Sequence, residues 1–184
     1  MAAELKVPVT CKIRCFKNEE ETLKMAKDIE NAGCSLLTVH GRTRFHNKQT
    51  VGNANWDIIK KIKQNANIPV FANGGIAGFD DVHECMEFTG VDGVMSSEYL
   101  LEYPALFEGK EFHHVEDLAI EYLELTKQYS GAPLSYIKAH LHKMLHTGLK
   151  ENTDLRARVV NIISADEGIQ ICNELKEYRK DVVA

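Results

Sequence analysis

Apolar and polar positions predict four strand-then-helix units in the first part of the chain. Each unit begins with a short run rich in β-branched residues, which favours a strand, and continues into a segment with helical spacing. Strands that alternate with helices are typical of a parallel sheet. The predicted strands cover residues 7–14, 35–40, 68–73 and 93–96, and the predicted helices cover residues 18–33, 55–65, 80–88 and 103–108.

The pattern changes near residue 110, after which only helical periodicity is found. Helices are predicted over residues 115–129, 135–147, 153–163 and 165–179. Ser164 and Glu167 form a capping box at the start of the last of them. We therefore predict an α/β fold in two domains, residues 1–110 and 111–184, the second of which is helical throughout.

Strand alternation places two cations on one face of the first strand. Its apolar positions, which suit a layer of helices, are Val9, Cys11 and Ile13. Lys12 and Arg14 therefore point to the opposite face, which in a βα barrel is the lumen. Charges on a buried face need anionic partners. The two cations indicate an anion site, and the alternative is that a neighbouring carboxylate absent from this chain satisfies them.

Polar or glycine-rich sequences follow the other three strands. They are His40-Gly-Arg-Thr43, Asn73-Gly-Gly-Ile76 and Met95-Ser-Ser-Glu98. α/β barrels keep their active sites at this end of the strands. The glycines after the third strand and the small residues after the fourth suit backbone N–H contacts to a phosphate. Trp56 and Tyr122, by contrast, are expected to anchor the core.

The motifs of the first 107 residues resemble those of the tRNA-dihydrouridine synthase family. Pro8–Arg14 is similar to its VKIR strand, Leu37–Thr43 to its HGRT turn and Pro69–Ile76 to its ANGxI turn. Gly93–Glu98 is similar to its last strand. The serine–glutamate ending of that strand, followed by Pro104–Phe107, resembles the eukaryotic branch that modifies D-loop uridines 16 and 17.

The resemblance implies the C-terminal half of a TIM (β/α)8 barrel, followed by a small all-α domain. A whole barrel needs about 250 residues, which is more than the 184 of this chain. It also implies an FMN-dependent oxidoreductase, with NADPH or NADH as the reductant and tRNA as the substrate. In that family the flavin passes a hydride to C6 of a flipped uracil ring and a cysteine protonates C5, giving 5,6-dihydrouridine.

The same resemblance implies a set of cofactor-binding residues. Lys12 would lie beside N1 and O2 of the flavin, where a cation stabilises the reduced ring, and His40 would lie beside the flavin or near its phosphate. The phosphate would be held from two sides, by the Asn73 turn and by the Ser97 segment. Glu98 would contribute its backbone N–H and turn its carboxylate away. The full set is Lys12, His40, Asn73, Gly74, Gly75, Ser97 and Glu98.

The catalytic cysteine of the family stands in an Asn-x-Gly-Cys-Pro context before the first strand found here. None of the five cysteines of this chain has that context. We therefore assign no catalytic residue and expect no turnover by the chain alone. An open half-barrel leaves strand edges unpaired, so it would pair with the missing N-terminal half or with a second copy.

The predicted helix over residues 135–147 carries a basic face. Lys138, His142 and His146 recur at four-residue spacing opposite an apolar stripe. The family's helical domain grips tRNA, and the alternative is an ordinary solvated helix face. Lys143 stands where a His-Glu-x-x-His zinc motif has glutamate, so no metal site is predicted. The implied tRNA contacts are Arg14, Arg42, Lys138, His142 and Lys143.

Composition limits the other possibilities. The net charge of −5 argues against a surface that is basic overall, without excluding a local basic patch. No apolar run approaches the roughly 20 residues of a membrane span, and no secretory signal is found. We expect a cytoplasmic protein, with the nucleus as the alternative. Two other functions stay open: a non-catalytic tRNA-binding module, and another FMN-dependent TIM-barrel oxidoreductase that acts on a small molecule.

Overall fold

The computed structural model divides the chain into two compact units, Met1–Ser97 and Glu98–Ala184. It describes residues 2–45, 53–109, 113–129 and 131–183, and the side chains of these up to residue 179. The sequence placed the boundary near residue 110. The division falls earlier because α4 (Glu98–Glu102) packs against α6 (Leu134–Met144), within the helical unit.

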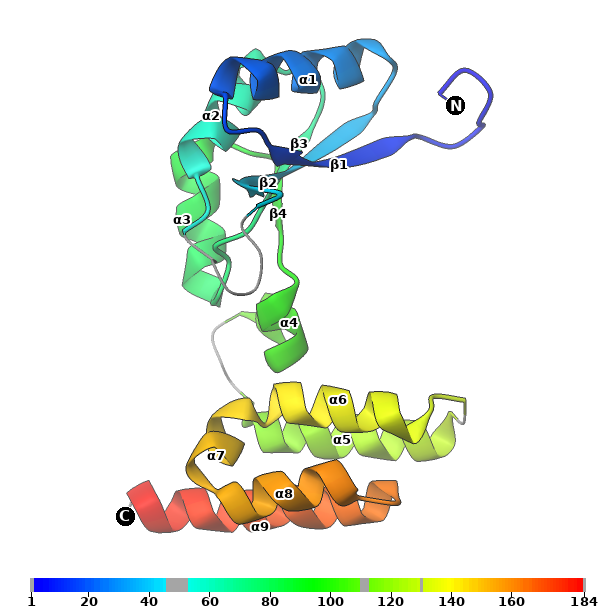
Figure 1. Ribbon diagram of the computed structural model, residues 1–184, viewed down its shortest axis with the longest axis vertical. Coiled ribbons are helices and arrows are strands. Elements are labelled where there is room, and N and C mark those ends of the chain that lie inside the picture. Colours follow the sequence, from blue (N-terminus) through cyan, green and yellow to red (C-terminus); the bar gives the residue numbers. More distant parts are fainter. Residues whose placement is uncertain (1, 46–52, 110–112, 130, 184) are drawn as a thin grey trace. The chain divides into compact units, whose positions relative to one another are not determined.

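The first unit contains a four-stranded parallel sheet in the order β1-β2-β3-β4. The strands are β1 (Thr10–Cys15), β2 (Leu36–Thr43), β3 (Val70–Asn73) and β4 (Gly93–Met95), and the helices are α1 (Glu19–Asn31), α2 (Trp56–Asn65) and α3 (Phe79–Thr89). Figure 1 shows α1, α2 and α3 on one side of the sheet. This architecture is consistent with a partial TIM-barrel-like fold.

Burial alternates between the two faces of the sheet on the edge strand β1, whereas on β2 residues of both faces, Thr38 and Val39, are buried. Val39, Val70 and Ala72 on the central strands are fully buried, because their side chains pack beneath the helices. On the edge strand β1 the side chains of Lys12 and Arg14 are exposed, and those of the alternating apolar positions are more buried. The alternation predicted for this strand is therefore confirmed.

Local signals set the helix ends where the sequence predicted them. The side-chain oxygen of Asn18 accepts a hydrogen bond from the backbone N–H of Glu21 and so caps α1. Asn55 caps α2 in the same way, through the N–H of Ile58. Gly33 follows the end of α1 with φ of 92°, a left-handed conformation that favours glycine.

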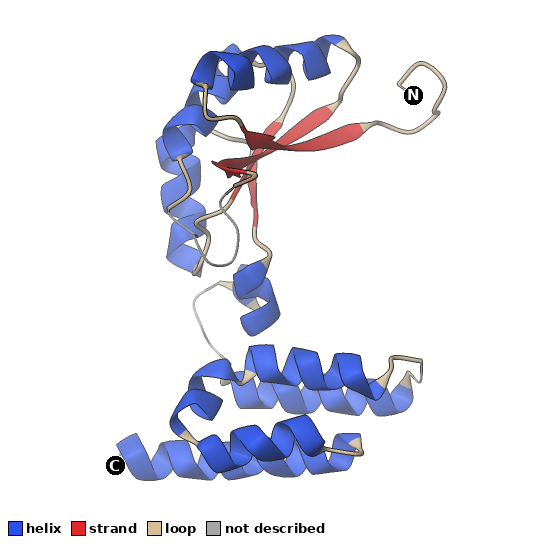
Figure 2. Ribbon diagram, in the orientation of Figure 1, coloured by secondary structure: helices blue, strands red, loops and turns tan. Residues whose placement is uncertain are grey.

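In the second unit, the described residues form helices and no strand (Figure 2). A core of leucine, valine and isoleucine side chains, among them Leu123, Leu141 and Val159, holds the helices together. The helix predicted over residues 103–108 is wrong in its position. The α-helix of this segment is α4, which ends at Glu102, and residues 103–108 contain only a short 3-10 helix, η1 (Leu106–Glu108). The other helices are α5 (Val115–Gln128), α7 (His146–Glu151), α8 (Thr153–Asn161) and α9 (Ala165–Val183).

Candidate cofactor-binding site

The parallel register brings three predicted site residues into one row across the sheet. Arg14 on β1 pairs in register with His40 on β2, and His40 pairs with Asn73 on β3. Residues in register on neighbouring parallel strands point to the same face. The row therefore lies on the face opposite the helices, at the C-terminal end of the strands, where α/β proteins bind their ligands.

His40 is the most constrained member of this row. Its Nε2 atom is buried and has no hydrogen-bond partner among the residues that the structure describes. Burial, and after it the positive charges of Arg14, Lys12 and Arg42, together lower the pKa of His40 to about 4. The imidazole is therefore neutral at pH 7. A buried ring nitrogen without a partner is costly, so it points to a ligand.

Cations surround His40. Partial burial lowers the pKa of Lys12, and the neighbouring Arg14 adds to this effect. Arg14 donates a hydrogen bond from Nη1 to the carbonyl oxygen of Thr43 at 3.0 Å. Within the described ranges no carboxylate lies within ion-pair distance of Lys12. The rim thus concentrates positive charge without a matching carboxylate for this lysine.

A glycine turn follows β3 directly beside His40. Gly74 and Gly75 have φ of 93° and 79°, which side-chain-bearing residues rarely adopt. A Cβ atom on Gly74 would lie 2.8 Å from Cδ2 of His40, so the turn has no room for a side chain there. Asn73 before it is buried and donates from Nδ2 to the carbonyl oxygen of Met95 at 2.7 Å.

The remaining two predicted cofactor residues lie at the boundary of the units. Ser97 is exposed and ends the first unit, whereas Glu98 begins α4 in the second. The carboxylate of Glu98 lies 3.1 Å from Nζ of Lys143. Six of the seven predicted residues therefore belong to the first unit, and the carboxylate of the seventh has a cationic partner in its own unit.

The predicted tRNA contacts on α6 are partly engaged. Nζ of Lys143 contacts the carboxylate of Glu98 and lies 3.9 Å from Oε1 of Glu102. Lys138 and His142 are half-buried at the helix surface, opposite the buried apolar stripe that the sequence predicted. Within the residues that the structure describes, no group of three or more His, Cys, Asp or Glu side chains could hold a metal ion.

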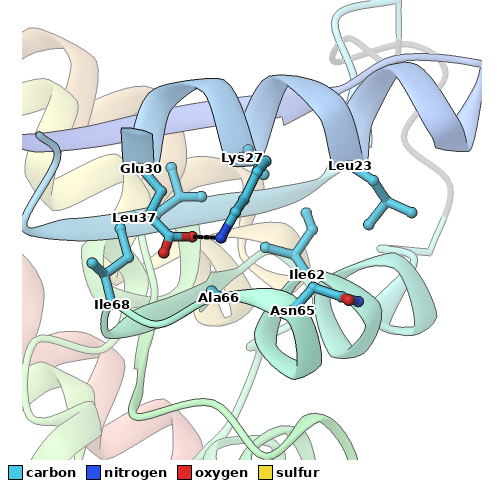
Figure 3. A pocket seen from close by; sticks show the side chains of 9 residues that line it. Leu23, Lys27, Glu30, Leu37, Ile62, Asn65, Ala66 and Ile68 are labelled. Atoms are coloured by element: carbon cyan, nitrogen blue, oxygen red, sulfur yellow. Dashed lines mark hydrogen bonds and ion pairs between the residues drawn. The ribbon is translucent and has the colours of Figure 1, made fainter. Parts of the chain in front are cut away.

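A pocket of about 340 Å³ lies between α1 and α2, on the helix-covered side of the sheet (Figure 3). Its wall is mainly apolar, with Leu37 from β2 and Ile62 from α2. Lys27 and Glu30 at its edge pair with each other at 3.2 Å. The charged groups of this pocket are thus already satisfied, and the strand rim is the better ligand site.

Sequence reasoning missed the role of Trp56. The indole Nε1 donates a hydrogen bond to the carbonyl oxygen of Gly74 at 3.0 Å, and the side chain is half-buried instead of lying in the core. Tyr122 packs against the core of the helical unit, as expected. It is half-buried there, and its hydroxyl contacts Nδ1 of His140 at 2.7 Å. A tryptophan at the first position of the helix after the His-Gly-Arg turn was the available signal.

A family model described as dihydrouridine synthase matches residues 1–184. The chain belongs to the dihydrouridine synthase family. It is 44% identical over 172 residues to a rat protein named tRNA-dihydrouridine(16/17) synthase [NAD(P)(+)]-like, covering 94% of this chain and 39% of the rat protein. It is 36% identical over 168 residues to the tRNA-dihydrouridine(16/17) synthase of Schizosaccharomyces pombe, covering 85% of this chain and 42% of that protein.

The chain thus spans about two fifths of the length of these dihydrouridine synthase relatives. A solved structure of mandelate oxidase aligns with 90% of this chain and 56% of its own, at 13% identity and a TM-score of 0.37. That similarity is too low to bear on function. None of the helices that the structure describes is long and apolar enough to cross a membrane.

Proposed function

We propose that this chain is the FMN-phosphate side of a tRNA-dihydrouridine synthase: the C-terminal half of a TIM barrel followed by a small all-α domain. Its family and the names of its relatives support this proposal. The four-stranded parallel sheet supports the half-barrel, and β1 and β4 stand at the two ends of its order. Further strands would pair with these edges, from the N-terminal part of the relatives or from a second copy.

The observation that carries the proposal is the buried, unpartnered Nε2 of His40 against a glycine that has no room for a Cβ. An anionic group with hydrogen-bonding oxygens fits such a cradle, because the surrounding charges from Lys12, Arg14 and Arg42 are positive. The phosphate and the reduced ring of FMN both meet this requirement. The residues present therefore fit the cofactor that the family implies.

Bound FMN would supply hydride transfer between a nicotinamide, NADPH or NADH, and a uracil ring. The chain's own residues would bind and orient the FMN. Lys12 would stabilise negative charge on the flavin ring, and His40 would offer a neutral ring nitrogen. The phosphate would be held by backbone N–H groups and small polar side chains, those of Asn73, Gly74, Gly75 and Ser97.

The helical unit would contact tRNA phosphates through α6. Lys138 and His142 support this role, because both reach the helix surface opposite its buried stripe. Lys143 would contribute less, since Glu98 already neutralises it. Contacts of this kind weaken as salt rises, through release of the counterions around the nucleic acid. Binding of tRNA that does not weaken between 50 and 200 mM salt, conditions typical of such measurements, would contradict this part.

The test of the whole proposal uses the 184-residue chain with FMN, NADPH and unmodified tRNA. We expect quenching of flavin fluorescence, which reports cofactor binding, and no dihydrouridine in the tRNA when the nucleosides are separated. Failure to bind FMN would overturn the cofactor assignment. Dihydrouridine formed by the chain alone would overturn the prediction that the chain is incomplete as an enzyme.

A further inference from the structure

We propose that Trp56 is a positioning residue for the phosphate-binding turn: its indole N–H fixes the peptide between Gly74 and Gly75 so that the N–H of Gly75 is directed at the ligand phosphate. This inference rests on the proposed FMN site and adds to it a residue from outside the glycine turn. It assigns to the chain's only tryptophan a role in cofactor affinity.

The geometry of the contact gives the direction of the peptide. Nε1 of Trp56 lies 3.0 Å from the carbonyl oxygen of Gly74. A trans peptide is planar, with its C=O and N–H on opposite sides, and no cis peptide occurs in the described part of the chain. Holding the Gly74 carbonyl towards Trp56 therefore aims the N–H of Gly75 away from it. With φ of 79° at Gly75, this orientation is one that glycine adopts readily.

The backbone before Trp56 is itself fixed by hydrogen bonds. Trp56 is the first residue of α2, and Asn55 before it caps that helix through Oδ1. The N–H of Asn55 donates to the carbonyl oxygen of Gly41 at 2.7 Å. A Cβ atom on Gly41 would lie 2.7 Å from the carbonyl oxygen of Asn55, so the two backbones are in close contact.

The segment Ala54–Trp56 thus connects the C-terminal part of β2, at Gly41, to the turn after β3. A Cβ atom on Gly74 would lie 3.2 Å from the Cβ of Ala54, and one on Gly75 would lie 3.2 Å from Nε1 of Trp56. A connection of this kind fixes the position of His40, at the end of β2, relative to the glycine turn. Fixed donors bind an anion more tightly than mobile ones, because less ordering remains to be done on binding.

The ring of Trp56 also packs near Phe88, at 6.4 Å between centroids. This contact makes the hydrogen bond and the packing separable by mutation. Trp56→Phe keeps an aromatic ring and removes the N–H donor. Phe88→Leu disturbs the packing on the same indole and keeps the hydrogen bond, and Phe88 is 43% exposed, so the change is mild.

The experiment measures the dissociation constants of FMN and of riboflavin, which lacks the phosphate, for the unaltered chain and both variants by flavin fluorescence. We expect Trp56→Phe to weaken FMN binding about fivefold, the size of one lost hydrogen bond, with riboflavin binding unchanged. Phe88→Leu should leave both constants unchanged. Circular dichroism at the titration temperature confirms that each variant is folded.

The outcomes separate this inference from the proposed function. If the unaltered chain does not bind FMN, the cofactor assignment and this inference are both overturned. If it binds FMN and Trp56→Phe binds FMN equally well, only the positioning role is overturned. An equal loss of FMN and riboflavin in Trp56→Phe, or in Phe88→Leu, would assign the tryptophan to packing alone. If Trp56→Phe does not fold, Trp56→His, which keeps a ring N–H donor, is compared with Trp56→Leu, which has none. The positioning role requires that Trp56→His bind FMN more tightly than Trp56→Leu.

Discussion

Cations of the helical unit and Lys12 at the rim of the sheet differ in their partners, although lysines elsewhere in the first unit also pair with carboxylates. In the helical unit, basic side chains stand beside carboxylates: Lys127 beside Asp166, Lys176 beside Asp117 and Arg179 beside Glu116. At the rim of the sheet, Lys12 has no carboxylate within ion-pair distance in the described ranges. The pKa values show the contrast, because that of Lys127 is raised by its hydrogen bonds to Asp166 and Glu124, and that of Lys12 is lowered.

This difference distinguishes cations that stabilise the fold from cations that can bind an anionic ligand. A paired cation stabilises the fold and has little left to offer an anionic ligand. A cation that is partly buried beside another cation destabilises the apo protein slightly and gains when an anion arrives. The rim therefore has the charge distribution of a binding site, and the ion pairs of the helical unit have that of a scaffold.

The largest expected effect concerns the buried carboxylate of the scaffold. Glu116 is 2% exposed, and Arg179 contacts its Oε1 at 3.0 Å. Arg179→Met should lower the free energy of unfolding by about 3 kcal/mol, because a buried charge loses its partner. Urea unfolding followed by circular dichroism measures it. Lys176→Met, on the same helix, removes the pair with Asp117, whose carboxylate is far more exposed than that of Glu116, and should cost less. Equal losses would contradict the distinction.

The glycine turn should be nearly as sensitive, for a different reason. Gly74→Ala should destabilise the first unit by about 2 kcal/mol, since it combines a strained φ with a clash against the ring of His40. The matched variant is Gly90→Ala, where φ is 71° and no atom lies within 4 Å of the added Cβ. It should cost about 1 kcal/mol, from strain alone. Thermal unfolding compares the two, and a smaller loss for Gly74→Ala would remove the argument for a closed cradle.

The stability of the first unit should depend on pH through His40. Its pKa falls from 6.5 to about 4 on folding, so the unfolded chain binds a proton that the folded chain does not over this range. The stabilisation is present above pH 6.5 and is lost as the pH falls towards 4. Between pH 7 and pH 5 we expect a loss of about 1.5 kcal/mol that His40→Gln abolishes. Urea unfolding at both values tests it, and an identical loss in the variant would exclude His40 as the cause.

The smallest expected effect is a change in stability that has opposite signs for a lysine at the rim and a lysine of the helical unit. Lys12→Met should stabilise the apo chain slightly, because it removes one of two adjacent cations. The gain should be less than about 1 kcal/mol, because much of the side chain still meets solvent. Lys127→Met should destabilise it, because Glu124 and Asp166 lose their partner. Melting temperatures at low salt measure both, and high salt should reduce each shift. The same sign for both variants would contradict the distinction between Lys12 at the rim and the paired cations of the helical unit.

Much of the sheet and its rim could be predicted from the sequence. Alternation along β1 separated Lys12 from Cys11, and Asn18 marked the start of α1 through its own cap. The residues Arg14, His40 and Asn73 were each recognised at a strand end, and the parallel register brings them into one row. Such features depend on neighbours in the chain and on the regular geometry of strands, both of which a sequence displays.

Other features were decided by tertiary structure alone. The contact of Trp56 with Gly74 joins residues 18 positions apart, and that of Lys143 with Glu98 joins residues 45 apart. No periodicity connects such pairs, because they depend on how whole elements pack. The same holds for the boundary at Ser97, which α4 sets by packing on α6. Local pattern thus indicates which side chains stand at the C-terminal ends of the strands, because strand geometry is regular, and only packing fixes how firmly each is held.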